Sequence, residues 1–168
     1  HIVSVIPYSI LGAFQFSSRL RQRRPAWHRA SGRVLVGLAL LVAFSGLWMT
    51  LAYETKPGSG ALLYGFRLVV GTAMAASVAL GFAAIRRGEV GRHRAWMTRA
   101  YALALGAGTQ VLTGAFGPML VGTSVLANDL TMGAAWVINL AIAEYSLRRG
   151  KSHSGRVPVR VATGSRAT

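Results

Sequence analysis

Five long apolar segments separated by short connections constrain this chain more than any other feature of its sequence. A helix needs about 20 apolar residues to cross the ~30 Å hydrocarbon core of a bilayer. None of the segments alternates apolar and polar residues with the period of two that is typical of strands. The sequence therefore predicts an all-α, multi-pass transmembrane helical bundle over residues 1–149, with five spans: Ile2–Ser18, Val34–Tyr53, Leu62–Ile85, Ala100–Val121 and Leu130–Leu147.

The composition excludes two other classes of protein. Hydrophobic residues make up 52% of the chain and charged residues only 14%, whereas soluble domains carry about 25% charged residues. A mean hydropathy of +0.42 argues against intrinsic disorder, which requires low hydrophobicity. The absence of cysteine excludes disulfides, thiolate nucleophiles and iron–sulfur clusters. Because the chain starts at His1 without a methionine, we expect that an upstream segment has been removed or left out.

The distribution of Lys and Arg predicts the topology. The net charge is +15, and the basic residues cluster at 19–33, at 86–99 and in the tail from Arg148, while the other two connections hold only Lys56. The positive-inside rule then places both basic connections and the C-terminus in the cytoplasm, so we expect a protein of the cytoplasmic (inner) membrane. Residues 150–168 read as a disordered basic cytoplasmic tail. No basic stripe with interleaved aromatic residues lies on a polar segment, so we expect no nucleic-acid partner.

The two basic connections end alike, which suggests a repeat of two helical hairpins. One reads HRASGR and the other HRAWMTR before the next apolar segment. His28 and His93 are therefore expected at equivalent depths, at the cytoplasmic mouths of two spans. Pro25 is favoured in the first turn of a helix, which would put His28 in that turn.

The chain resembles a known family in these same motifs. The runs GAFQFSSRLRQRRPAWHRASGR, SGLWMTLAY, HRAWMTRAYALALGAGTQ and AAWVINLAIAE are similar to the predicted membrane proteins of domain of unknown function 2306. The resemblance covers about residues 1–149 and implies a multi-pass bacterial membrane protein. It implies no activity.

Polar residues inside apolar spans need partners or a function, because each costs about 2.5–3.5 kcal/mol on insertion. For Arg67, near the outer face, the candidate partners are Glu54 and Asp129. Gln110 and Asn139 lie in mid-span and are expected to hydrogen-bond between helices. Arg33, Arg99 and Glu144 share a depth near the cytoplasmic interface. We predict that they form a structural polar layer in which Glu144 pairs with a basic side chain.

Three functions remain open from the sequence. The residues show no catalytic constellation, which favours a non-catalytic or assembly-type component that contacts other membrane subunits. His28 and His93 could instead hold a haem b as axial ligands, or join Glu144 in a three-ligand metal site. A small transporter or lipid-binding protein that uses the region of Arg67 and Gln110 is the third alternative.

Overall fold

The structure is a computed structural model that describes residues 1–54 and 57–154. These residues form helices and their connections, with no strand among them, which confirms the all-α prediction. The helices are α1 (Ile2–Gln15), α2 (Ser18–Arg23), α3 (Pro25–Ala52), α4 (Ala61–Arg86), α5 (Val90–Ala104), α6 (Gly106–Val121) and α7 (Val125–Ser154).

The prediction of five spans is wrong. Three helices, α3, α4 and α7, are long and apolar enough to cross a membrane, and a fourth span exists only if α5 and α6 are counted together. These two helices meet at a bend of 41°, so the predicted span 100–121 is not one straight helix. The first predicted span corresponds to α1, whose 14 residues extend over about 21 Å, short of the ~30 Å of hydrocarbon.

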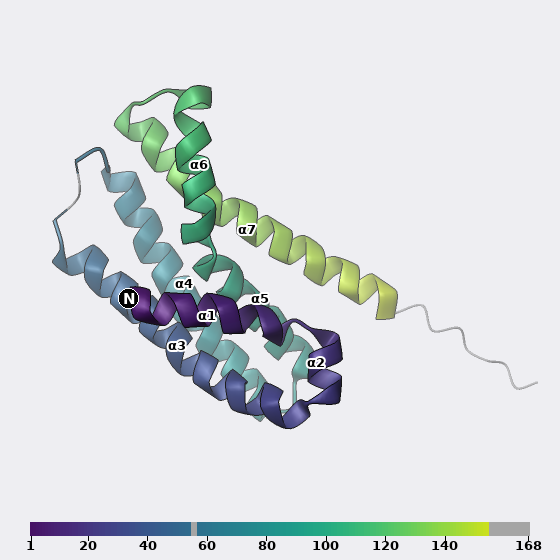
Figure 1. Cartoon of the computed structure of the whole chain (residues 1–168). Helices are drawn as coiled ribbons and strands as arrows, with labels where there is room; N and C mark the ends of the chain where they lie inside the picture. The colour runs from purple at the N-terminus through teal and green to yellow at the C-terminus, as the bar shows by residue number, and fades with distance from the viewer. Residues whose placement is uncertain (55–56, 155–168) are drawn as a thin grey trace, which may run out of the picture.

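Figure 1 shows that the connections between the helices lie toward two ends of the molecule. The α3–α4 and α6–α7 connections lie at one end, which we call the low-charge end. Helix α2, the α4–α5 connection and the C-terminal part of α7 lie toward the other, which we call the basic end because the Arg clusters map to these segments. In both basic segments the histidine is the fourth residue of its helix, His28 in α3 and His93 in α5. Pro25 occupies the first turn of α3, as predicted.

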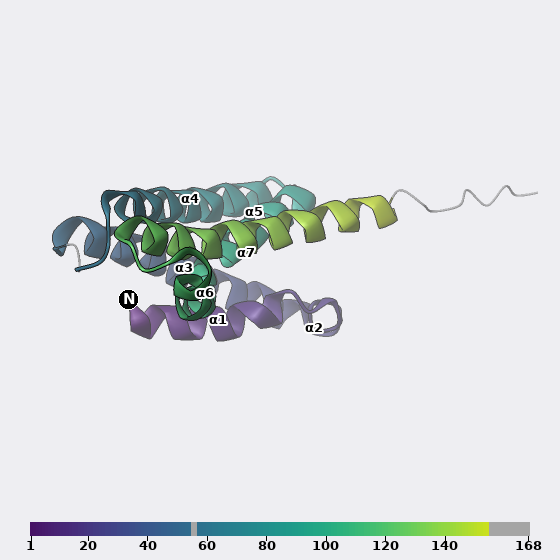
Figure 2. The ribbon, with the colours of Figure 1, turned by 90° about the horizontal axis from the view of Figure 1, so that it is seen from above.

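Helices α3 and α4 pack side by side at the centre, with α1 on α3 and α5 on α4, and α7 contacts α4, α5 and α6. Figure 2 shows α1 and α4 on opposite sides of this arrangement. The main core is apolar and joins α1, α3, α4 and α5 through Tyr8, Leu35, Ala39, Val42, Ala43, Met74, Val78, Ala100 and Leu103. Large apolar side chains on α1 and α6 remain exposed, as suits surfaces in contact with lipid: Ile6, Ile10, Val111, Phe116, Met119 and Leu120.

The bend between α5 and α6 has an identifiable cause. It falls at Leu105, next to Gly106, and helix kinks concentrate at such glycines. The indole of Trp136 from α7 lies directly against Gly106, where an added Cβ would clash with Trp136 Cδ1. Only a glycine admits the ring this closely, so the contact with α7 lies at the residue that follows the bend. Pro7, by contrast, leaves α1 continuous from Ile2 to Gln15.

The C-terminal boundary differs from the expected one. Helix α7 continues to Ser154, beyond the predicted start of the tail at residue 150. The rest of the predicted tail, residues 155–168, lies outside the described residues.

Candidate functional site

A cavity of about 720 Å³ lies inside the bundle toward the low-charge end. Its volume falls within the range of about 300–1,000 Å³ that is common for ligand pockets. Residues of α1, α3, α4, α5, α6 and α7 all contribute to it. Its walls are mostly apolar and include Val5, Val42, Ala43, Met49, Val70, Met74, Leu103, Ala107 and Trp136.

Polar groups gather on one part of the cavity wall. Arg67 of α4 and Glu54, which follows the last turn of α3, both line it, with Tyr53 and Tyr64 close by in sequence. Arg67 is half-buried, whereas Glu54 is exposed. Arg67 lies six residues after the first residue of α4, which is about 9 Å along the helix at 1.5 Å per residue. The lining of the cavity is therefore mostly apolar and includes one cation and one anion.

The guanidinium of Arg67 has no protein partner within residues 1–54 and 57–154. It makes neither an ion pair nor a hydrogen bond there, so neither expected pairing, with Glu54 or with Asp129, is present. An arginine at this depth is costly unless its charge is compensated. Its guanidinium presents a planar fork of donors that suits carboxylates and phosphates.

Asp129 of α7 is unavailable to Arg67 because its carboxylate caps the start of α4, the helix that carries Arg67. Its Oδ1 accepts from the backbone N–H of Gly60 at 2.9 Å, and its Oδ2 accepts from that of Leu63 at 3.1 Å. Gly60 is the N-cap of α4, so a carboxylate from α7 satisfies donors that the first turn of α4 leaves open. The side chain is 2% exposed. Sequence patterns for capping are local and gave no signal for a cap supplied 69 residues away.

The two mid-span amides both bond between α6 and α7. Gln110 Nε2 donates to the carbonyl of Met132 at 3.2 Å, and Asn139 Oδ1 accepts from Thr109 Oγ1 at 3.1 Å. Gln110 also lines the cavity. Asn139 Nδ2 is buried with no hydrogen-bond partner among the described residues. These bonds hold α6 against α7 beyond the bend.

At the basic end, the structure brings together two of the three residues of the expected polar layer. Arg99 of α5 grips Glu144 of α7 with two donors, Nε to Oε1 at 2.5 Å and Nη2 to Oε2 at 3.2 Å. The guanidinium also lies 5.0 Å from the ring centroid of Trp96. Arg33 is exposed and forms no ion pair with a described residue. An ion pair between Arg99 and Glu144 thus joins α5 to α7, and Arg33 does not take part in it.

The two histidines lie in the same region but have different surroundings. His93 Nδ1 donates to the carbonyl of Gly81 at 2.9 Å; since a carbonyl only accepts, Nε2 of His93 carries the lone pair. His28 is half-buried and close enough to His93 to interact with it electrostatically. The described residues contain no group of three or more His, Asp or Glu side chains that could hold a metal ion. The three-ligand site of His28, His93 and Glu144 is therefore wrong.

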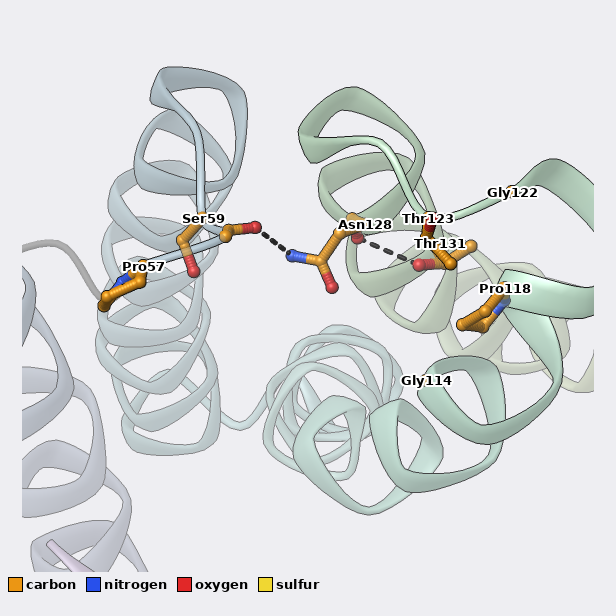
Figure 3. A pocket seen from close by; sticks show the side chains of 9 residues that line it. Pro57, Ser59, Gly114, Pro118, Gly122, Thr123, Asn128 and Thr131 are labelled. Carbon is orange, nitrogen blue, oxygen red and sulfur yellow. Dashed lines mark hydrogen bonds between the residues drawn. The ribbon is translucent and has the colours of Figure 1, made fainter.

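A second, smaller hollow of about 350 Å³ lies between the α3–α4 connection, α6 and α7. Figure 3 shows Asn128 reaching from α7 toward this connection, where its Nδ2 donates to the carbonyl of Gly58 at 2.9 Å. Thr131 Oγ1 donates to the carbonyl of Asn128 at 2.9 Å. The lining residues carry no charge, so this hollow has no equivalent of Arg67.

Comparisons with known proteins bear on the family and leave the activity open. A family model described as "Predicted membrane protein (DUF2306)" matches residues 1–147. No curated protein matches the chain, and no solved structure matches it.

Proposed function

The chain belongs to the DUF2306 family of predicted membrane proteins, and we propose that it is a non-catalytic lipid-binding component of the membrane. Its ligand is an amphiphile with a phosphate or carboxylate in its headgroup, held with the head at Arg67 and the apolar part inside the bundle. The observation that carries this proposal is the position of Arg67, a half-buried cation without a protein partner on the wall of a 720 Å³ cavity.

Two physical arguments support an amphiphile over a small polar solute. The wall beyond Arg67 is lined by Val42, Met74 and Leu103, and burying apolar surface there is favourable by about 25 cal/mol per Å². An acyl chain can fill this space, whereas an ion or sugar cannot use it. The charge of Arg67 is then compensated by the headgroup, in a bidentate, charge-assisted pair.

Lipid retention by the purified protein tests the proposal. We expect Arg67→Gln to weaken binding of an added anionic phospholipid about tenfold or more, since a hydrogen bond to a charged group contributes about 1.5–3 kcal/mol. Ala107→Phe, which adds a ring on the cavity wall, should weaken binding without changing charge. Native mass spectrometry of the protein in mild detergent, with and without the lipid, measures both effects.

Matched controls make the result specific. Arg94→Gln removes an exposed charge at the basic end, and Ala115→Phe adds a ring to an exposed position of α6 outside the cavity lining. Both should bind lipid as the original protein does. Equal retention by all four variants would contradict the proposal.

A b-type haem on His28 and His93 is the second candidate, and one observation favours it. The bond from His93 Nδ1 to Gly81 leaves Nε2 free to ligate, the arrangement that ligating histidines usually adopt. Against it, α3 packs on α1 and α4 while α5 packs mainly on α4 and α7, so the two histidines stand on helices that make little direct contact with each other. The absorption spectrum of the same preparations distinguishes the candidates: a Soret band that His93→Ala abolishes would support haem.

We also infer that the basic end and the C-terminus face the cytoplasm of a bacterial inner membrane. The support is the charge bias of the sequence: the Arg clusters map to the basic end, and the two connections of the low-charge end hold a single basic residue, Lys56. A periplasmic reporter inserted at Gly58 should be active, and the same reporter after residue 154 should be inactive. Activity at both positions would contradict the topology.

A further inference from the structure

We propose that the cavity selects a zwitterionic headgroup, with a phosphate on Arg67 and a primary ammonium on Glu54. This inference rests on the proposed function, because it names the class of lipid that the same cavity takes. The observation behind it is that a cation and an anion line one cavity without forming an ion pair with each other.

Glu54 differs from every other acidic residue of the chain. The sequence has only four Asp and Glu residues. Asp129 caps α4, Glu89 pairs with Arg92 at 2.9 Å, and Glu144 pairs with Arg99. Glu54 makes no ion pair or hydrogen bond with a described residue. In a chain of net charge +15, the one acid without a partner among the described residues thus lies on the wall of the same cavity as Arg67, which also has none there.

A carboxylate at this place penalises a purely anionic ligand. A headgroup whose only charge is a phosphate gains its attraction to Arg67 but is repelled by Glu54, and like charges brought together at a binding site oppose association. A headgroup that adds an ammonium turns this repulsion into a second charge-assisted hydrogen bond. Arg67 and Glu54 together therefore attract zwitterionic headgroups and disfavour purely anionic ones. Binding sites achieve specificity by such a combination of attraction and repulsion.

The different depths of Glu54 and Arg67 suit a headgroup that places its phosphate on Arg67 and its ammonium on Glu54. Glu54 is exposed beyond the end of α3, whereas Arg67 is half-buried within α4. A phospholipid carries its phosphate nearer to the acyl chains than its amine. The phosphate would therefore reach the deeper guanidinium while the ammonium meets the outer carboxylate. Tyr53 and Tyr64, which also line the cavity, add ring faces that attract a cation.

The test compares two lipids that have identical acyl chains and differ in the headgroup amine. Phosphatidylethanolamine or phosphatidylglycerol is added to the delipidated full chain in nonionic detergent, and native mass spectrometry gives the fraction bound. We expect the ethanolamine lipid to bind at least fivefold more tightly. Glu54→Gln should remove or reverse this preference by strengthening glycerol-lipid binding and weakening ethanolamine-lipid binding. Glu89→Gln, which neutralises a carboxylate at the basic end, should leave the preference unchanged.

The outcomes separate this inference from the proposed function. If both lipids bind equally, or Glu54→Gln leaves their ratio unchanged, the zwitterion inference is overturned, while the loss of both lipids in Arg67→Gln would still support a lipid-binding cavity. If the original protein retains neither lipid, both proposals fail. Comparable thermal unfolding of Glu54→Gln and the original protein excludes misfolding as the cause of a changed ratio.

Discussion

Replacing Asp129 by alanine is expected to destabilise the protein more than any other single change at the low-charge end. The carboxylate is 2% exposed and accepts from the backbone N–H groups of Gly60 and Leu63. Without it, these donors at the start of α4 lose their partners, each at a cost of about 1–3 kcal/mol when buried. We expect a loss of about 2–4 kcal/mol, seen as a clearly lower midpoint of thermal unfolding in detergent.

Two further variants give the prediction a graded control. Asp129→Asn keeps the shape and one acceptor oxygen, so it should lie between the original protein and Asp129→Ala. Asn128→Ala removes the neighbouring bond to Gly58, which is exposed, and should cost less than about 0.5 kcal/mol. If Asp129→Ala unfolds at the same temperature as Asn128→Ala, the interhelical cap does not stabilise the fold.

At the basic end, we expect Glu144→Gln to lower the stability by about 1–2 kcal/mol. Arg99 grips both carboxylate oxygens and lies over Trp96, so its charge loses its counter-ion when Glu144 is neutralised. Breaking a fully buried ion pair would lower the stability more. Here the side chains are 31% and 37% exposed, so water screens part of the lost attraction. Thermal unfolding of Glu144→Gln, of Arg99→Gln and of the double variant measures the coupling of the pair.

The chain contains a matched control for the Arg99–Glu144 ion pair. Glu89 pairs with Arg92 within one helical turn, and Arg92 is 69% exposed. Exposed pairs of this kind contribute about 0.2–1 kcal/mol or less, so Glu89→Gln should unfold close to the original protein. A coupling of Arg99 and Glu144 no larger than that of Arg92 and Glu89 would show that this ion pair contributes no more to stability than an exposed surface pair.

Trp136 links the bend to the cavity, which explains how this fold creates a site. The same indole packs on Gly106 and lines the cavity wall. Helix α6 therefore turns away from the direction of α5 next to the cavity, which residues of both helices line. A straight helix over residues 100–121 would direct Gln110 differently relative to Arg67. The bend is part of the site, and its position depends on one glycine and one tryptophan.

The sequence by itself determined the class of this protein and the position of its helices. Long apolar runs leave a membrane helix as the only way to satisfy backbone hydrogen bonds in hydrocarbon, and this is a local property. The segments predicted at 62–85 and 130–147 accordingly lie within α4 and α7, and the segment at 34–53 extends only one residue beyond the end of α3. Basic clusters likewise mark one end of the bundle because charge is excluded from the bilayer core.

Only the tertiary structure decided which polar residues meet. Arg33, Arg99 and Glu144 share a depth, but depth does not specify the rotation of a helix about its axis. Arg99 forms an ion pair with Glu144, whereas Arg33 forms none with a described residue. Asp129 was expected near Arg67 for the same reason, yet it caps α4, because two unsatisfied N–H groups lie closer to it than the guanidinium does. The bend at Leu105 and the cavity were also hidden from the sequence. They accompany the contact between Gly106 and Trp136, residues 30 positions apart, and no local pattern encodes a contact over that separation.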